Sequence, residues 1–79
     1  MLISDIPTDT FNRIIADLRS DGWKTISEYD GIDAWIDYGA ILLKQDSTEL
    51  FFEWNNWWEG SIQGPDILLE ELQEKYELK

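Results

Sequence analysis

The segment ILLKQDSTELFF, residues 41–52, has the pattern of a β-hairpin. Asp46 and Ser47 are turn-forming residues, and aliphatic and aromatic residues flank them on both sides. A two-residue turn pairs Lys44 with Glu49, Leu43 with Leu50, Leu42 with Phe51 and Ile41 with Phe52. Since side chains alternate between the two faces of a strand, every second residue falls on one apolar face, which we expect to face the core. This face consists of Ile41, Leu43, Leu50 and Phe52.

The next turn downstream is predicted at Asn55-Asn56. A strict two-residue loop would place Glu59 beside Phe52 in the core. One additional loop residue, Trp57, avoids this, because side-chain period two makes the register sensitive to a single residue. The resulting register pairs Trp54 with Trp58, Phe52 with Gly60, Leu50 with Ile62 and Glu53 with Glu59.

Two consequences of this register concern charge and sugar binding. The Glu53–Glu59 pair carries like charges, which costs stability. Trp54 and Trp58 are expected inside, against Phe11, Ile15, Leu68 and Leu72. Trp57 alone then remains free, and one Trp is a poor platform for a carbohydrate.

Upstream of the central hairpin, residues 23–29 alternate with period two and end at Asp30-Gly31, a strong two-residue hairpin signal. This signal pairs residues 23–29 with residues 32–38. The core face would then hold Trp23, Thr25, Ser27, Tyr29, Ile32, Ala34, Ile36 and Tyr38. The opposite face would pair Lys24 with Asp37, Ile26 with Trp35 and Glu28 with Asp33. The residues expected to face the core have even numbers from Ile32 to Tyr38 but odd numbers at Ile41 and Leu43. Gly39-Ala40 is therefore either a turn or a bulge.

Helices are predicted at both ends of the chain. Phe11, Ile14, Ile15 and Leu18 form one apolar stripe in a helix with Thr8 as N-cap and Gly22 as left-handed cap. Pro65 opens a second helix with the stripe Leu68, Leu69, Leu72 and Tyr76. The expected fold is a single α+β domain over residues 1–79 in the order α-β-β-β-β-α. Its four- to five-stranded antiparallel sheet has both helices on one face.

The outer face of this sheet is the candidate site, because carboxylates there interleave with apolar side chains. The predicted partner-binding residues are Ile26, Asp33, Trp35, Asp37, Glu49, Phe51, Glu53 and Glu59, and Leu42 and Glu28 lie among them. An apolar centre with a polar rim is typical of an interface. The structural alternative is that a tail or the stems of Lys24 and Lys44 cover the apolar groups.

Composition narrows the classes of function. The chain has 79 residues, no cysteine, no histidine and a net charge of −11 from 17 acids and 6 bases. Thiol chemistry is excluded, and the commonest general base and metal ligand is missing. The charge repels nucleic acid and anionic membranes, although solubility alone also explains it. With no signal peptide recognised at the N-terminus, we expect a cytoplasmic protein.

No catalytic or metal-binding constellation emerges. Asp30-Gly31-Ile32-Asp33 lacks the further ligands of a calcium loop, and the Glu53–Glu59 pair lies on an open face with no walls for a substrate. We therefore expect a non-catalytic binding protein with no cofactor and no metal.

The expected partner is a basic protein surface, as for inhibitors, immunity proteins or nucleic-acid mimics. Carboxylates at i and i+2 of a strand lie ~6.8 Å apart, roughly two steps of the ~3.4 Å charge rise along one DNA strand. The alternative is a homodimer joined through the outer faces or edge strands, with no foreign ligand.

Overall fold

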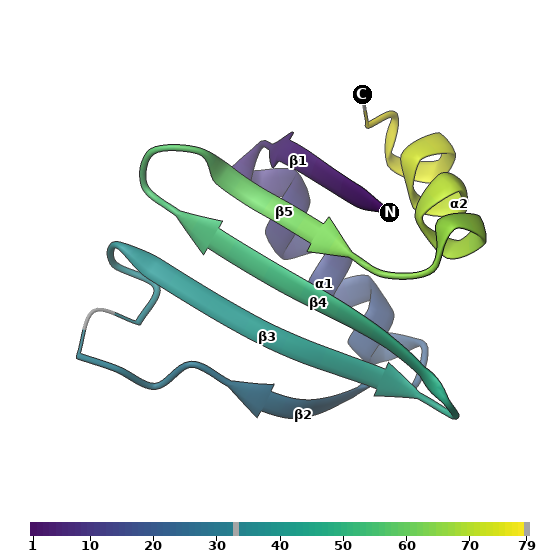
Figure 1. Cartoon of the computed structure of the whole chain (residues 1–79), viewed down its shortest axis with the longest axis horizontal. Helices are drawn as coiled ribbons and strands as arrows, with labels where there is room; N and C mark the ends of the chain where they lie inside the picture. Colours follow the sequence, from purple (N-terminus) through teal and green to yellow (C-terminus); the bar gives the residue numbers. More distant parts are fainter. Residues whose placement is uncertain (33, 79) are drawn as a thin grey trace.

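One antiparallel sheet and two helices form the fold of the computed structural model, which describes residues 1–32 and 34–78 (Figure 1). Along this part of the chain the elements are β1 (Leu2–Ile6), α1 (Thr8–Ser20), β2 (Lys24–Glu28), β3 (Tyr38–Gln45), β4 (Thr48–Asn55), β5 (Glu59–Gln63) and α2 (Asp66–Tyr76). The strand order is β1-β5-β4-β3-β2. The expected α+β class, with an antiparallel sheet and terminal helices, is confirmed.

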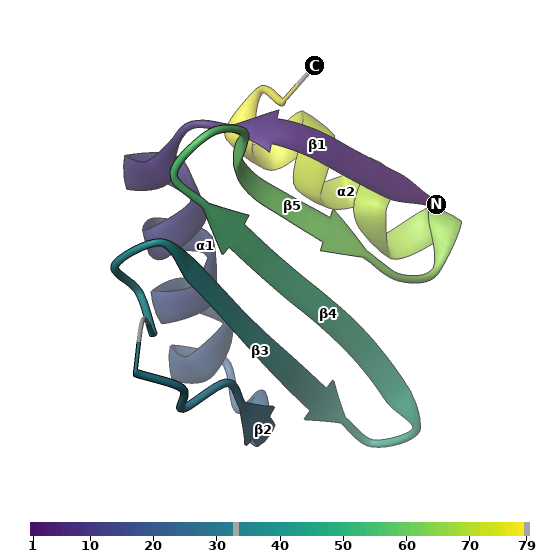
Figure 2. The same cartoon turned by 60° about the vertical axis from the view of Figure 1, so that its left-hand side comes forward.

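Both helices cover the same face of the sheet. Helix α1 links the two edge strands and passes behind the sheet in Figure 1, and Figure 2 shows α2 behind β1 and β5. The core lies between these layers, because the stripes of both helices join the inner sheet residues in one apolar cluster. Its fully buried side chains include Phe11, Ile14, Leu43, Leu50, Phe52, Ile62 and Leu69. The other face of the sheet, which we call the open face, points toward the viewer in Figure 1.

The hairpin of β3 and β4 has the predicted register. Leu43 pairs with Leu50, Leu42 with Phe51 and Ile41 with Phe52 around the Asp46-Ser47 turn. Gly39 and Ala40 are neither a turn nor a bulge, since both lie inside β3 and pair with β4. The irregularity lies instead in β2, between Thr25 and Ser27.

The register of β5 differs from the prediction by two residues. Trp54 pairs with Gly60, Phe52 with Ile62 and Glu53 with Ser61. A shift of two preserves which side chains face the core, so Ile62 is buried as expected. The predicted Glu53–Glu59 and Trp54–Trp58 pairs are both wrong, because Asn55 pairs with Glu59 and the loop spans residues 56–58.

The hairpin predicted at Asp30-Gly31 does not form. Strand β2 pairs with the far half of β3, for example Thr25 with Leu43 and Glu28 with Ile41, and the described residues 29–32 and 34–37 belong to the connection. The longer β3 offers β2 a partner that β4 already holds in place, whereas the predicted hairpin would have been an isolated pair of strands of marginal stability. Ile32 and Ile36, expected in the core, are exposed.

Strand β1 was absent from the sequence-based prediction. Ile3 and Ile6 are both buried although they lie three residues apart. The register of β1 against β5 shifts between them, and Asp5 has a φ of 56°. This irregularity turns both isoleucines inward and removes the period-two pattern that identifies a strand.

The end of α1 explains how the chain enters β2. Gly22 has a φ of 99°, as expected for a left-handed cap. The amide of Trp23 donates to the carbonyl of Leu18, and that of Gly22 donates to the carbonyl of Arg19, which is the Schellman arrangement.

The N-caps of both helices differ from the prediction. Pro7 rather than Thr8 is the N-cap of α1, and Pro65 is the N-cap of α2 rather than its first helical residue. Within the described residues, neither helix has the length and apolar character needed to cross a membrane.

Candidate functional site

The predicted site residues separate into two regions of the molecule. Glu49, Phe51 and Glu53 lie on the open face of β4, as expected from their register. Ile26 is exposed on the edge strand β2. Asp37 belongs to the loop of residues 29–37, and Glu59 stands at the start of β5. Asp33 lies outside the described residues.

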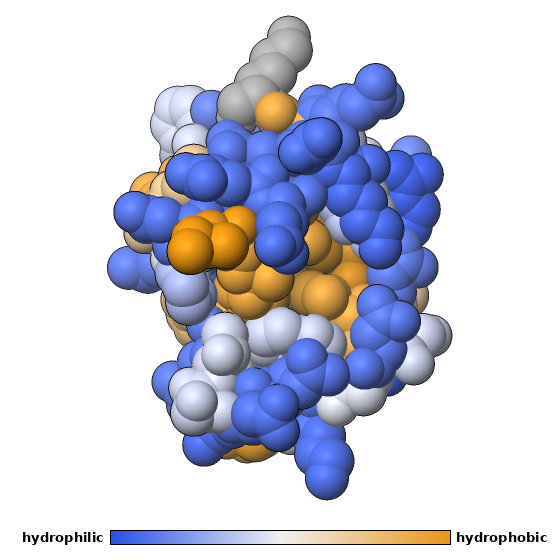
Figure 3. Space-filling view, turned by 90° about the vertical axis from the view of Figure 1, so that its right-hand side faces the viewer, coloured by the Kyte–Doolittle hydropathy of each residue, from blue (hydrophilic) through white to orange (hydrophobic). Residues whose placement is uncertain are grey.

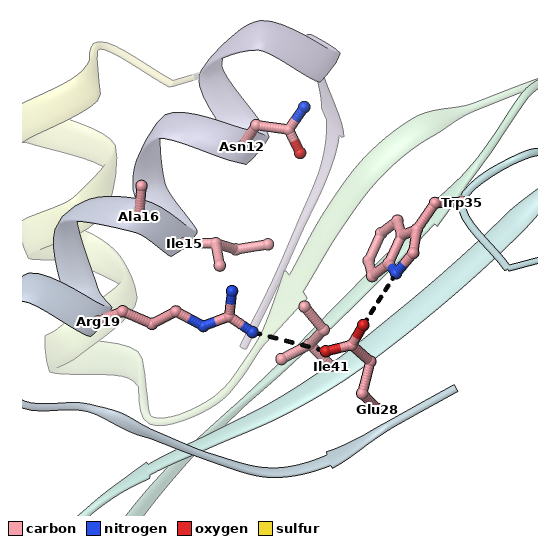
Figure 4. A pocket seen from close by; sticks show the side chains of 7 residues that line it. All are labelled: Asn12, Ile15, Ala16, Arg19, Glu28, Trp35 and Ile41. Atoms are coloured by element: carbon pink, nitrogen blue, oxygen red, sulfur yellow. Dashed lines mark hydrogen bonds and ion pairs between the residues drawn. The ribbon is translucent and has the colours of Figure 1, made fainter. Parts of the chain in front are cut away.

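Trp35 does not lie on the outer face, which corrects the prediction. Its indole stands on the helix side, with its ring centroid 6.3 Å from that of Phe11 and 6.4 Å from that of Trp54. Gly39 makes room for it, since a Cβ there would lie 2.2 Å from the indole. Figure 4 shows the indole facing α1, with Nε1 donating to Glu28, which also meets Arg19 across 3.6 Å. Trp35 therefore closes the core under α1.

Glu53 has a favourable partner within its own fold. The hydroxyl of Tyr38 donates to its Oε2 over 2.7 Å on the open face. This hydrogen bond, together with burial and the nearby carboxylate charge, raises the pKa of Tyr38 to about 12. Glu53 is thus engaged structurally rather than repelled by Glu59, whose carboxylate accepts a hydrogen bond from Thr8 on α1.

The two loops at one end of the molecule, on the left in Figure 1, carry large exposed apolar side chains. We define this loop end as residues 29–32, 34–37 and 56–59. Trp57 and Trp58 are 73% and 72% exposed, Ile36 is 65% exposed and Ile32 is fully exposed. Trp58 was predicted inside, so its exposure is a correction. Exposed apolar groups that occur together, rather than singly, mark surfaces that bind.

Hydrogen bonds hold the two loops of this end together. Asn55 Oδ1 accepts from the amides of Trp57 and Trp58 at 2.9 and 2.7 Å, which fixes the turn. Asn56 Nδ2 donates to Asp37 Oδ1 over 2.6 Å, and its amide donates to the Asp37 carbonyl. Trp35, between the exposed Ile32 and Ile36 in the chain, anchors the first loop in the core. The apolar side chains are thus carried on a fixed backbone.

The charges around the loop end are acidic. The chain has no Lys or Arg from Thr25 to Leu43, and none from Gln45 to Glu74. Asp30, Asp37 and Glu59 belong to the loop end itself, and all three are exposed. The loop end therefore carries both exposed apolar side chains and carboxylates, and it lies at the ends of the strands rather than on the sheet face where the site was predicted.

Two hollows elsewhere are weaker candidates. One lies between α1 and β3, where Ile15, Arg19 and Trp35 are among its lining residues (Figure 4). The other lies beside the β3–β4 turn, and Figure 3 shows apolar side chains framed by charged ones on that side of the molecule. Trp23, Ile67 and Leu68 line it, but Trp23 is buried and Ile67 is its one strongly exposed apolar side chain.

Within residues 1–32 and 34–78, no group of three or more carboxylates is placed to hold a metal ion. The Glu53–Glu59 pair on which a glycosidase-like arrangement would depend is not formed. No family model, curated protein or solved structure matches this chain.

Sequence reasoning missed the loop end because it treated residues 32–38 as a strand. One signal was available in Asn55, because an Asn at this position fixes its own turn and needs no further strand residue.

Proposed function

We propose that this protein is a non-catalytic binding protein whose loop end covers a basic, partly apolar surface of another protein. The observation that carries the proposal is the exposure of Trp57, Trp58, Ile32 and Ile36 on two loops that hydrogen bonds between Asn56 and Asp37 join. Trp is the residue type most enriched among side chains that dominate binding energy. A fixed loop also loses little conformational entropy when it binds.

The acidic charge of the chain predicts that the partner's surface is basic. Asp30, Asp37 and Glu59 belong to the loop end, and its loops contribute no basic side chain. Carboxylates at a rim speed the encounter with a basic surface and disfavour acidic ones. Occlusion of a basic site, as by an inhibitor or an immunity protein, agrees with this charge.

A carbohydrate ligand is the second candidate, because two exposed Trp residues also suit sugar stacking. Two observations favour a protein. The Asn55 and Asn56 side chains, which could bind sugar hydroxyls, already form hydrogen bonds within the loops. Ile32 and Ile36 add aliphatic surface, which a polar sugar does not need.

The test uses the full chain as bait for proteins of a cell lysate, followed by affinity measurement with the purified partner. We expect Trp57→Ser and Trp58→Ser each to weaken binding by about 30-fold or more, and high salt to slow association. Ile67→Ser is the matched control, because Ile67 is 74% exposed but lies on α2.

Unchanged affinity in both Trp variants would contradict the proposal. Loss of binding in Ile67→Ser alone would move the site to the hollow beside α2. Trp-dependent binding to an oligosaccharide array, without capture of a protein, would replace the protein partner with a sugar. Thermal unfolding of each variant shows that the fold is kept, since exposed side chains contribute little to stability.

A further inference from the structure

The open face of the sheet carries an apolar centre that neither helix covers. Leu42 and Phe51 are directly opposed in the middle of β3 and β4, and both are half-buried. Leu2 and Ile26, on the two edge strands, are 62% and 53% exposed. An antiparallel sheet usually presents polar side chains on its solvent face, so this centre needs an explanation beyond the loop end.

The charge on this face differs from that of the rest of the molecule. On β2, β3 and β4 it carries Lys24 and Lys44 against Glu49 and Glu53, so it is balanced in a chain with a net charge of −11. A second copy therefore meets less repulsion at this face than at the acidic remainder of the surface.

Lys24 and Lys44 place positive charge on the open face that no ion pair among the described residues neutralises. They are direct cross-strand neighbours, a like-charge pair that costs stability. In the strand register, Glu49 is the cross-strand neighbour of Lys44. Glu53 lies on the same face at the other end of β4, beyond Phe51.

We propose that the open face is a self-association surface, and that its occupant is a second copy of this chain related by a two-fold axis that runs across the strands. This axis places Leu42 and Phe51 over their counterparts. Lys44 then lies over Ala40 of the second copy and diagonal to its Glu53. Glu49 lies over that same Glu53, because Lys44 and Glu49, like Ala40 and Glu53, are cross-strand neighbours. Lys44 and Lys24 offset the repulsion between these two carboxylates. Each end of the interface gathers two lysines and two glutamates.

The size of the face sets the strength of this association. Five strands spaced ~4.8 Å apart, the longest of them eight residues, span a face of roughly 24 Å by 26 Å. Two such faces packed at ~10 Å bury on the order of 1,000 Å², near the lower limit for a specific interface. The dimer is therefore weak and depends on concentration.

The test is analytical ultracentrifugation of the full chain over micromolar to millimolar concentrations, with no partner present. The wild type is expected to pass from monomer to dimer. Lys44→Glu and Glu53→Lys alone should each weaken the dimer at least tenfold, because each brings like charges together at both ends. An equimolar mixture of the two variants should associate again, since both contacts then pair opposite charges.

Monomeric wild type at all concentrations would overturn the proposal, and so would variants that dimerise as well as the wild type or a mixture that stays monomeric. Trp57→Ser is the control: its dimerisation should match the wild type, because the loop end lies off this face. Loss of dimerisation in Trp57→Ser would assign self-association to the loop end instead. The result is independent of whether the loop end binds a foreign protein.

Discussion

At the scale of single residues, Trp35 shows how one side chain can look like an interface residue and be a core residue. It sits between carboxylates in the sequence, yet its backbone has a φ of 61°, which redirects its side chain. A left-handed conformation is uncommon for a bulky residue and persists only where its surroundings hold it. Here Phe11 and Trp54 pack beside the ring, and Gly39 leaves space for it.

We expect Trp35→Ala to lower the free energy of unfolding by about 3 kcal/mol, because it leaves a cavity beneath α1 and frees the loop. Trp57→Ala, at a 73% exposed position, should change it by less than about 0.5 kcal/mol. Urea denaturation followed by circular dichroism measures both. Equal stability of the two variants would mean that Trp35 does not close the core, and would restore it as a candidate for the outer face.

At the scale of elements, the contact between β5 and α1 depends on Gly60. This residue pairs with Trp54 on β4 and with Ile6 on β1, so it stands in the middle of the sheet. A Cβ at this position would lie 2.3 Å from Phe11 Cδ1, and Phe11 is itself fully buried. Because protein interiors are close-packed, the ring has little room to move away.

Gly60→Ala should therefore destabilise the protein by about 1–3 kcal/mol, the usual cost of overpacking a core. Its neighbour Ser61 is half-buried on the opposite side of β5 and serves as the control, with Ser61→Ala expected within about 0.5 kcal/mol. Thermal unfolding of both variants provides the comparison. A neutral or stabilising Gly60→Ala would show that α1 can shift away from the sheet.

The elements that could be predicted from the sequence are those with strong local periodicity. The β3–β4 hairpin and both helices have apolar residues at the period of their own geometry, and their register and buried faces were predicted correctly. Strand β1 and the true partner of β2 were not, because an irregularity hides the period of β1 and the choice of β3 as partner is a long-range one. Of the residues predicted for the outer face, Glu49, Phe51 and Glu53 lie there, whereas tertiary contacts place Trp35 on the helix side.

At the scale of the whole molecule, two tyrosines join neighbouring elements through carboxylates, one within the sheet and one between the helices. Tyr38 donates to Glu53 between β3 and β4, and Tyr76 donates to Asp17 over 2.6 Å between α2 and α1. Burial, the hydrogen bond and the charge of Asp17 raise the pKa of Tyr76 to about 12, although Arg13 lies 5.4 Å above its ring and acts in the opposite direction. The hydrogen bond to Glu53 and burial raise the pKa of Tyr38 to about 12 as well.

These values make the stability of the protein fall at alkaline pH. An unfolded tyrosine loses its proton near its ordinary pKa of 10.0, whereas the folded ones keep theirs until about 12. Between these values the folded state binds more protons than the unfolded state, so the free energy of unfolding decreases as pH rises. The contribution is complete below about pH 10 and is lost as pH approaches about 12. Each tyrosine should account for about 1 kcal/mol, after allowance for partial solvent screening.

Urea denaturation at a series of alkaline pH values measures this loss. The double variant Tyr38→Phe/Tyr76→Phe keeps both rings but has neither hydroxyl, so its stability should be lower at neutral pH and should fall less steeply toward about pH 12 than that of the wild type. Each single variant should remove about half of the difference, because the two tyrosines lie in different layers and share no partner. The same slope in the double variant and the wild type would show that other groups govern alkaline unfolding, and that the two carboxylate contacts do not stabilise the pairs of elements that they join.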